Sequence, residues 1–221
     1  MDYPGDPPAP RLVYGDAQLL VVDKPAGLLS VPGRGADKQD CAAARVRRDH
    51  PDALVVHRLD MATSGLLLMA RGTVVQRTLS RAFEQRQVRK RYVALAAGHI
   101  APPCAADGWG CIELPLIADW PNRPRQMVDA AHGRPSRTRW RVLDHEAGLD
   151  ATRVELEPVT GRSHQLRVHL MALGHPILGD ALYAPPAVHG RSPRLLLHAS
   201  ELELDHPGTG ERMRWRSPVP F

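Results

Sequence analysis

The stretch VVHRLDMATSGLLLMA, residues 55–70, places a polar segment between two short apolar runs. Short apolar runs that end at turn residues are typical of buried strands, so strands are predicted at residues 55–56 and 66–70. Most of the reactive side chains of the stretch lie between these runs: His57, Arg58, Asp60, Thr63 and Ser64. A polar connection of this kind is either an ordinary turn or a loop that places a reactive group at the floor of a cleft.

The rest of the chain has more predicted strands than helices. Apolar patterns predict strands at residues 12–14, 18–23, 88–97, 112–117, 126–130, 138–144, 152–157, 194–199 and 201–204. Helices are predicted at residues 39–49, 73–87 and 162–173, and the second has an apolar stripe of Val74, Val75, Leu79, Ala82 and Phe83. Because most connections are short, we predict an α+β fold with a central, mixed and mostly antiparallel sheet flanked by helices, and not a doubly wound sheet.

Length and composition favour one large globular domain. The chain has 221 residues, of which 43% are hydrophobic, and we expect residues 1–10 to form a short N-terminal arm and residues 11–221 to form one domain. No apolar run approaches the ~20 residues of a membrane-spanning helix, and the N-terminus lacks a signal-peptide pattern. Three cysteines form no even disulfide framework, which favours a reduced, cytoplasmic protein.

The charge balance favours a partner rich in phosphate. The formal net charge is +5, the pI is about 9.5, and Lys24, Lys38 and Lys90 are the only lysines among 29 basic residues. A GC-rich genome is an alternative source of the arginine excess, but it does not explain the basic cluster at residues 71–91, where Glu84 is the only acid. Arginine grips phosphate through two parallel hydrogen bonds, so this segment predicts contact with nucleic acid.

Metal chemistry and serine hydrolysis are both disfavoured by residue spacing. His164 and His169 are five positions apart, so they do not share a helix face as two metal ligands would. His57, Asp60 and Ser64 are the residue types of a catalytic triad, but they lie within eight positions and no G-x-S-x-G motif accompanies them. We therefore expect no metal site and no triad.

Asp60 remains as a single carboxylate among apolar residues. Taken alone, Asp60 fits a reactive carboxylate and a turn aspartate equally well. In a turn, its side chain would accept hydrogen bonds from nearby backbone N–H groups. Two other segments favour a reactive role, because GRSHQLRVH (residues 161–169) opens a predicted helix with Arg162 and KRYVA (residues 90–94) places Tyr92 on a predicted strand. If these segments meet across one cleft, Asp60, Arg162 and Tyr92 converge.

Taken together, these segments resemble the RluA-type pseudouridine synthases. HRLDMATSGLLLMA is similar to the aspartate motif of this family, KRYVA to its tyrosine motif, GRSHQLRVHL to its arginine-containing motif and RLLLHA (residues 194–199) to its final strand motif. DKPAGLLSVPG (residues 23–33) resembles the first motif, and PLIADWPNRPRQ (residues 115–126) resembles the narrower RluA branch. The resemblance covers residues 23–199 in family order. As in that branch, we expect no separate N-terminal RNA-binding domain, which many other relatives carry.

The resemblance implies the pseudouridine synthase fold with a central active-site cleft, so that residues 11–221 form the catalytic domain. It implies an isomerase that converts specific uridines of RNA to pseudouridine, in stem-loops of 23S rRNA and of tRNA, including the anticodon loop. It also implies an enzyme without cofactor or metal. A monomer without an obligate protein partner is the default expectation, and the short apolar runs predict no membrane contact.

The resemblance assigns roles to the matching residues. Asp60 is the implied nucleophile, and attack on the sugar, attack on the pyrimidine ring and a glycal route all remain open. Arg162 is the implied charge-assisted partner of Asp60. Tyr92 is implied to lie against the target base and to take part in proton transfer, whereas the residue alone also fits an edge-strand aromatic side chain packed on the sheet.

Further residues are implied to hold the RNA. A target uridine must be flipped out of the stack, at a cost of a few kcal/mol that is smaller for loop bases. Arg58 matches the family arginine that enters the vacated space, and a local salt bridge to Asp60 is the alternative. Phosphate-positioning contacts are expected from Arg77, Arg81 and Arg86. Other RNA contacts are expected from Thr63, His164, Gln165 and Arg167, and residues 63–65 are also expected to shape the turn after Asp60.

Two competing functions are compatible with parts of the sequence. The first is a catalytically silent RNA-binding or RNA-chaperone protein on the same fold. The combination of Asp60, Tyr92 and Arg162 argues against it, because an RNA binder has no need of a cleft carboxylate that repels phosphate. The second is an RNA methyltransferase, which needs a glycine-rich cofactor loop after a strand, and the sequence contains none.

Overall fold

The computed structural model describes residues 6–221, and within them the chain forms two compact units. The first unit contains residues up to 90 and residues 198–220, and the second contains residues 91–197 together with Phe221. Half of the expected N-terminal arm, residues 1–5, lies outside the described residues. In the other half, the Arg45 guanidinium donates hydrogen bonds to the carbonyl groups of Pro7 and Pro8 and pairs with Asp6.

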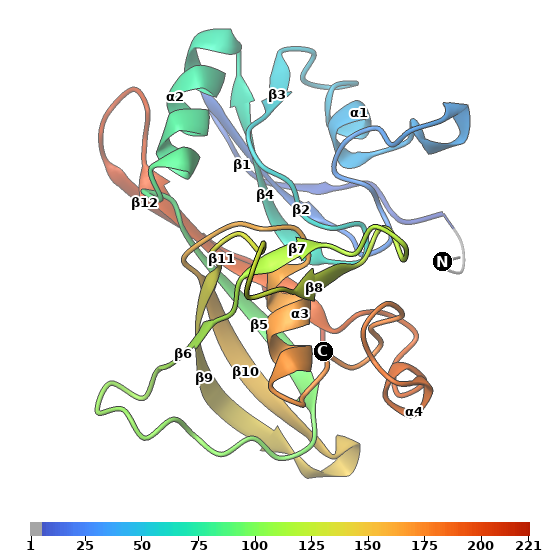
Figure 1. Ribbon diagram of the computed structural model, residues 1–221. Helices are drawn as coiled ribbons and strands as arrows, with labels where there is room; N and C mark the ends of the chain where they lie inside the picture. Colours follow the sequence, from blue (N-terminus) through green and yellow to red (C-terminus); the bar gives the residue numbers. More distant parts are fainter. Residues whose placement is uncertain (1–5) are drawn as a thin grey trace. The chain divides into compact units, whose positions relative to one another are not determined.

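The first unit is built around a strand that is buried on both faces. This strand, β4 (Ser64–Arg71), pairs with β2 (Leu19–Lys24), β3 (Ala53–Val55) and β11 (Leu197–Asp205). The sheet also contains β1 (Arg11–Gly15), which pairs with β2, and β12 (Arg212–Arg216), which pairs with β11. A 3-10 turn (Ala36–Lys38) and two helices, α1 (Ala42–Val46) and α2 (Thr73–Glu84), complete the unit (Figure 1).

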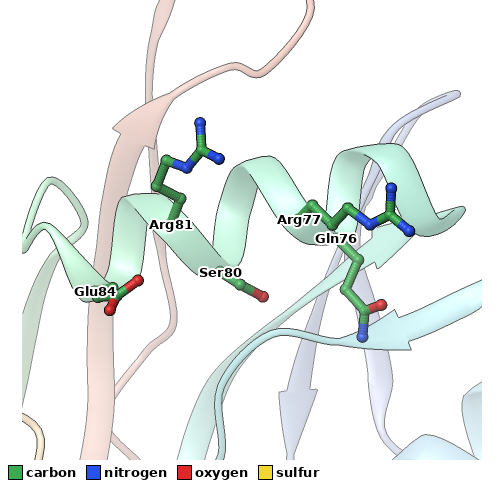
Figure 2. A pocket seen from close by; sticks show the side chains of 5 residues that line it. All are labelled: Gln76, Arg77, Ser80, Arg81 and Glu84. Carbon is green, nitrogen blue, oxygen red and sulfur yellow. The ribbon is translucent and has the colours of Figure 1, made fainter.

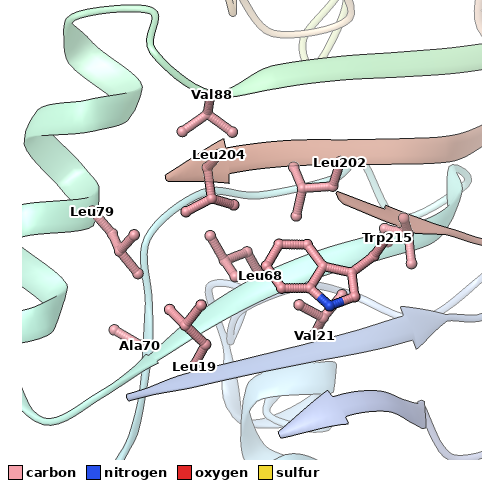
Figure 3. Close-up of a cluster of buried hydrophobic side chains, with 10 residues drawn as sticks. Leu19, Val21, Leu68, Ala70, Leu79, Val88, Leu202, Leu204 and Trp215 are labelled. Carbon is pink, nitrogen blue, oxygen red and sulfur yellow. The ribbon is translucent and has the colours of Figure 1, made fainter. Parts of the chain in front are cut away.

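The apolar core of the first unit lies between the sheet and α2. Alternate residues of β4 point to the same face, so Leu66, Leu68 and Ala70 enter one cluster. Leu79 reaches this cluster from α2, and Trp215 reaches it from β12 (Figure 3). The intervening residues of β4 are also buried, which explains why its sequence is continuously apolar instead of alternating.

The second unit is an antiparallel sheet with a helix and a separate hairpin. Its strands lie in the order β5 (Arg89–Ala97), β10 (Ala151–Pro158), β9 (Arg137–Glu146) and β6 (Gly110–Glu113). The hairpin is formed by β7 (Leu116–Ala118) and β8 (Gln126–Val128). Helix α3 (Gln165–Ala172) packs against the hairpin through Val168 and Leu116, and a 3-10 turn (Ala147–Leu149) and the short helix α4 (Pro186–His189) complete the unit.

The predicted fold class is confirmed, while several element boundaries were wrong. The fold is α+β with a mixed sheet, in which β4 and β11 pair in parallel and the other pairings described within each unit are antiparallel. The strand predicted at residues 112–117 is two strands in different sheets, because Pro115 cannot donate a backbone hydrogen bond. The strands predicted at residues 194–199 and 201–204 are one strand, β11, and strand β12 was not predicted.

The predicted helices form, but they are shorter than expected. The one predicted at residues 39–49 is reduced to α1, and the one predicted to start at Arg162 starts at Gln165. Helix α2 ends at Glu84 because Arg86 takes a left-handed conformation with φ of 60°. Val74 was predicted in the apolar stripe of α2 but is 74% exposed. Within residues 6–221 no helix is long and apolar enough to cross a bilayer.

Gly65 permits the close parallel approach of β4 and β11. Its φ is +111°, and a Cβ atom there would lie 2.3 Å from the carbonyl oxygen of Ala199. Gly65→Ala is therefore expected to lower the free energy of unfolding by about 2–3 kcal/mol, through backbone strain and overlap with the neighbouring strand. Chemical denaturation measures this change. Gly148→Ala is the control, because a Cβ atom at Gly148 meets nothing within 4 Å, and equal stability of the two variants would contradict the prediction.

Ser64 is part of a buried hydrogen-bond chain beside Gly65. Its hydroxyl lies 2.9 Å from Nδ1 of His198, and Nε2 of His198 lies 3.0 Å from the Ser217 hydroxyl. Ser217 donates to the Asp23 carboxylate at 2.6 Å. Because Ser64 and His198 are 4% and 2% exposed, this serine joins strands inside the first unit.

Candidate active site

Asp60 lies in a loop whose main chain is held on both sides. The loop, residues 56–63, connects the antiparallel strands β3 and β4. The Ser30 hydroxyl donates to the carbonyl of Leu59 at 2.7 Å and accepts its N–H at 3.0 Å. The N–H of Gly27 donates to the carbonyl of Met61 at 2.9 Å. The backbone position of Asp60 is thus fixed by the segment that follows β2.

Lys24 is a buried cation that supports the same loop. Its side chain is fully buried, and Nζ donates to the carbonyl groups of Pro25, Leu28 and Met61 at 2.8, 2.7 and 3.2 Å. A buried ammonium group is tolerated when its three N–H groups find acceptors, as they do here. No role was predicted for Lys24 from the sequence. The available signal was a lysine, in a chain with two others, placed directly after an apolar strand.

His57 completes the backbone pairing of β4. Its Nε2 accepts the N–H of Leu68 at 2.9 Å, beyond the last residue of β3 that pairs with β4. The ring stacks on Phe83 of α2 with a centroid distance of 4.6 Å. Burial lowers the pKa of His57 to about 3, and the positive charge of Lys90 adds to the shift. The imidazole is therefore neutral at physiological pH, and its role is structural.

The lowered pKa of His57 predicts a loss of stability in mild acid. In the unfolded chain the imidazole binds a proton near pH 6.5, whereas in the folded chain it does so near pH 3. The unfolded state therefore gains protons first, and the free energy of unfolding is expected to fall by about 2 kcal/mol from pH 7 to pH 5 because of this residue. Urea denaturation at the two pH values measures the change. His57→Gln keeps an acceptor without a titrating group, and the prediction fails if its pH dependence equals that of the wild type.

The arginines predicted to position phosphates lie on the surface of the first unit. Arg77 and Arg81 are one turn apart on α2 and line a shallow hollow with Gln76, Ser80 and Glu84 (Figure 2). The same figure shows both guanidinium groups extending away from the helix. Arg86 and Arg58 are also exposed. Exposure makes these four side chains accessible to RNA, and their contacts with it stay a prediction.

Thr63 closes the turn that follows Asp60. It is 2% exposed, and its N–H donates to the carbonyl of Asp60 at 3.1 Å. This hydrogen bond closes the turn that follows Asp60. The structure therefore supports a role in shaping the loop and gives no support to direct contact with RNA.

Tyr92 and Arg162 both belong to the second unit. Tyr92 is half-buried on β5 and lies opposite Leu156 of β10. Arg162 precedes α3, and its backbone N–H donates to Oε1 of Gln165 at 3.1 Å. Its side-chain Nε is buried and has no hydrogen-bond partner among the described residues. A buried N–H on a charged group is costly unless an acceptor satisfies it, so this guanidinium is suited to a carboxylate or another anion.

Gln165 and Arg167 are internal side chains, and their predicted RNA contacts need correction. The Gln165 amide uses both of its ends, since Oε1 accepts from Thr160 at 2.7 Å and Nε2 donates to Thr138 at 3.0 Å. Arg167 is 3% exposed and forms two hydrogen bonds with Asp180, at 2.8 and 2.7 Å. Polar residues beside Arg162 suggested RNA contact, but both side chains point into the protein and hold α3 in place.

His164 also makes an internal contact. It takes a left-handed conformation before α3, with φ of 54°, and its Nδ1 lies 2.6 Å from the Tyr183 hydroxyl. The residue is half-buried, so the predicted contact with RNA stays a prediction. His169 is fully buried between Thr138 and the carbonyl of Leu114. In residues 6–221 no group of three or more His, Cys, Asp or Glu side chains is arranged to hold a metal ion.

The structure divides the predicted catalytic residues and Arg58 between the two units. Asp60 and Arg58 share the loop of the first unit, while Tyr92 and Arg162 lie in the second. The predicted convergence of Asp60, Tyr92 and Arg162 stays a prediction. Sequence reasoning missed the residues that set the loop geometry, namely Lys24, Gly27, Ser30 and His57.

Comparisons with known proteins identify the family. The profile of the RNA pseudouridylate synthase family matches residues 18–172. The chain is 49% identical to the dual-specificity RNA pseudouridine synthase RluA of Escherichia coli K12, over 95% of this chain and 93% of that protein. The protein of the same name from Yersinia pestis is 46% identical, over 95% and 99% of the two chains.

Solved structures of two human proteins agree with this assignment. Human RNA pseudouridylate synthase domain containing 1 is 31% identical, with a TM-score of 0.78 over 96% of this chain and 84% of that one. Human RNA pseudouridylate synthase domain containing 4 is 25% identical, with a TM-score of 0.70 over 95% and 88%. The chain therefore belongs to the RNA pseudouridylate synthase family and is a pseudouridine synthase, an isomerase.

Proposed function

We propose that this enzyme isomerises uridines in stem-loops of both tRNA and large-subunit rRNA, with Asp60 as its nucleophile. The observation that carries the role of Asp60 is the loop around it, which Ser30, Gly27 and Lys24 hold through the backbone of its two neighbours. Such restraint keeps a reactive side chain in one orientation before the substrate arrives. The substrate class is supported by the 49% identity to a relative named for dual specificity.

The proposed reaction needs no oxidant or reductant. The bond between C1′ of the ribose and N1 of uracil breaks, and a bond between C1′ and C5 forms. The C5 proton leaves and N1 gains a proton, so the product is an isomer of the substrate. A carboxylate is a suitable nucleophile for such chemistry because it forms and releases covalent intermediates at carbon. No cofactor takes part in this scheme.

The proposal gives three other residues, Arg162, Tyr92 and Arg58, roles in binding and converting the flipped uridine. We assign Arg162 to pairing with Asp60, a role for which its buried, unpartnered Nε is an available donor. We assign Tyr92 to contact with the target base and to proton transfer. Arg58, which is exposed, is assigned to fill the space that the flipped base leaves in the RNA stack. The proposal also includes a cytoplasmic monomer, with residues 11–221 as one catalytic domain.

Tritium release tests the proposed function directly. The purified protein is incubated with tRNA and rRNA stem-loop transcripts labelled with tritium at uracil C5, and released tritium is measured as water. Release from both RNA classes is expected. Release from one class alone would overturn dual specificity. Binding without release from either class, together with an unmodified RNA product, would overturn the proposal of tRNA and rRNA stem-loop substrates.

The arginines of α2 are expected to contribute to binding and not to chemistry. Arg77→Ala and Arg81→Ala should each weaken binding of any stem-loop by about threefold to tenfold and reduce the slope of log Kd against log salt by about 1, because each removes one phosphate contact. Fluorescence anisotropy at several salt concentrations measures both quantities. Arg216→Ala is the control, because Arg216 is exposed but paired with Glu201 at 2.8 Å. An unchanged slope in both variants would remove α2 from the interface.

A further inference from the structure

The loop between β7 and β8, residues 119–125, exposes an aromatic side chain in the second unit. Trp120 is 66% exposed, and it is the only aromatic residue among the exposed large apolar residues of the described chain. The guanidinium of Arg123 lies 4.4 Å from the centre of its ring. Because Arg123 covers one face, the exposed area of Trp120 belongs to the remaining face and the ring edges.

Internal hydrogen bonds give the Trp120 loop (residues 119–125) a defined conformation. The Asp119 carboxylate accepts hydrogen bonds from the backbone N–H and the side-chain amide of Asn122, at 3.3 and 3.0 Å. The backbone N–H of Asp119 donates to the carbonyl of Arg125 at 3.0 Å. The Asp119 carboxylate therefore forms its hydrogen bonds within the loop. These bonds hold the turn that carries the exposed Trp120 in one conformation.

The loop is also connected to the segment that contains Arg162. The N–H of Gln126, at the start of β8, donates to the Tyr183 hydroxyl at 2.8 Å. The same hydroxyl lies 2.6 Å from Nδ1 of His164, two residues after Arg162. Tyr183 is 5% exposed, so the two hydrogen bonds of its hydroxyl group are shielded from water. A ligand held by the Trp120 loop is thereby held at a defined position relative to Arg162 in the same unit.

The charge around Trp120 favours a polyanion over a protein surface. Neither Arg123 nor Arg125 forms an ion pair with a residue of the described chain, and the Arg125 guanidinium lies 5.5 Å from the centre of the Tyr183 ring. Trp109, in the same unit, provides a contrast, because three guanidinium groups lie within 6 Å of its ring centre but each belongs to an ion-paired arginine. An exposed aromatic ring with one guanidinium on its face, and a second arginine without an ion pair in the same loop, match the chemistry of unpaired RNA, in which bases stack and phosphates need cations.

We propose that the Trp120 loop is an RNA-binding element in which Trp120 stacks on an unpaired base of the substrate stem-loop. Arg123 and Arg125 contact the phosphates beside that base. This inference rests on the proposed function, since it names a surface that selects the same stem-loops. Stacking accepts any base with a π-face, so the loop recognises the presence of an unpaired nucleotide and its position relative to the target uridine.

The test separates RNA binding from chemistry. Trp120→Ala is expected to raise Kd and KM for a stem-loop by about tenfold or more, while the single-turnover rate at saturating RNA stays within about threefold. Trp120→Phe keeps a stacking ring and should retain binding within about threefold. Leu149→Ala is the matched control, because Leu149 is an exposed apolar residue of the same unit, 44% exposed, and no change is expected.

Photocross-linking supplies a second, independent readout. RNA with 4-thiouridine at the unpaired loop positions should cross-link to a peptide that contains Trp120. Unchanged Kd for Trp120→Ala, or cross-links confined to other peptides, would overturn the inference and would leave the exposed ring for a protein partner. Kd and cross-links need no turnover, so a wild type without tritium release would contradict the proposed function alone.

Discussion

Asp60→Asn is expected to reduce pseudouridine formation by at least about 1,000-fold, because the amide cannot act as a nucleophile at carbon. The size and shape of the side chain are nearly unchanged, and the loop is held by backbone groups of Leu59 and Met61 that the substitution does not touch. RNA binding should therefore stay within about threefold of the wild type. Single-turnover tritium release measures the rate, and anisotropy measures the binding.

Two further variants make the outcome specific to Asp60. Asp60→Ala removes the carboxylate altogether and should lose activity to the same extent. Asp52→Asn is the control, since Asp52 is a half-exposed aspartate near the same loop that pairs with Arg71 at 2.9 Å, and it should retain activity. Appreciable activity in both Asp60 variants would remove this residue from its proposed role, whereas equal losses in Asp52→Asn would point to a general effect of charge.

Arg167→Met is expected to lower the free energy of unfolding by about 3–5 kcal/mol, because it leaves a buried carboxylate without its partner. The side chains of Arg167 and Asp180 are 3% and 0% exposed, and two hydrogen bonds join them. Asp180 also accepts the N–H groups of Leu182 and Tyr183, so the loss should loosen the segment after α3. Chemical denaturation without RNA measures the change.

A second substitution tests the cause of this loss. Asp180→Asn in the Arg167→Met background removes the unpaired charge, while its amide oxygen can still accept the two N–H groups. The double variant should therefore be more stable than the sum of the two single changes predicts, with a coupling of about 1–3 kcal/mol. If Arg167→Met kept the stability of the wild type and lost RNA binding, the original prediction of an RNA contact would be restored.

Strand and helix patterns in the sequence predicted much of the fold because they depend on local periodicity. The continuous apolar run of β4 and the apolar spacing of α2 indicated their types. Strand β12 was missed although its sequence alternates, because its charged residues Arg212 and Arg214 lie in a polar segment near the end of the sequence. Their partner, Glu203 on β11, pairs with both, and only the pairing of the strands makes the alternation meaningful.

In the candidate site, too, some residues could be predicted from the sequence, whereas the roles of others depend on the folded structure. The motifs indicated Asp60, Tyr92 and Arg162, and RNA contacts were also expected from polar residues that lie near them in sequence. Gln165 and Arg167 stand beside Arg162 in the chain, yet a helix turns them toward different neighbours, and both serve the interior. The role of Lys24 depends on carbonyl groups that no strand satisfies, and these become visible only when the backbone path is known.

The support of the Asp60 loop by a distant segment limits how the site can be engineered. Ser30 and Leu59, which bind each other, are 29 positions apart in the chain. A graft of residues 57–65 onto another hairpin would carry the aspartate without the groups that orient it. The smallest transferable part therefore consists of two pieces, residues 24–30 and residues 57–65, and a host scaffold must place both.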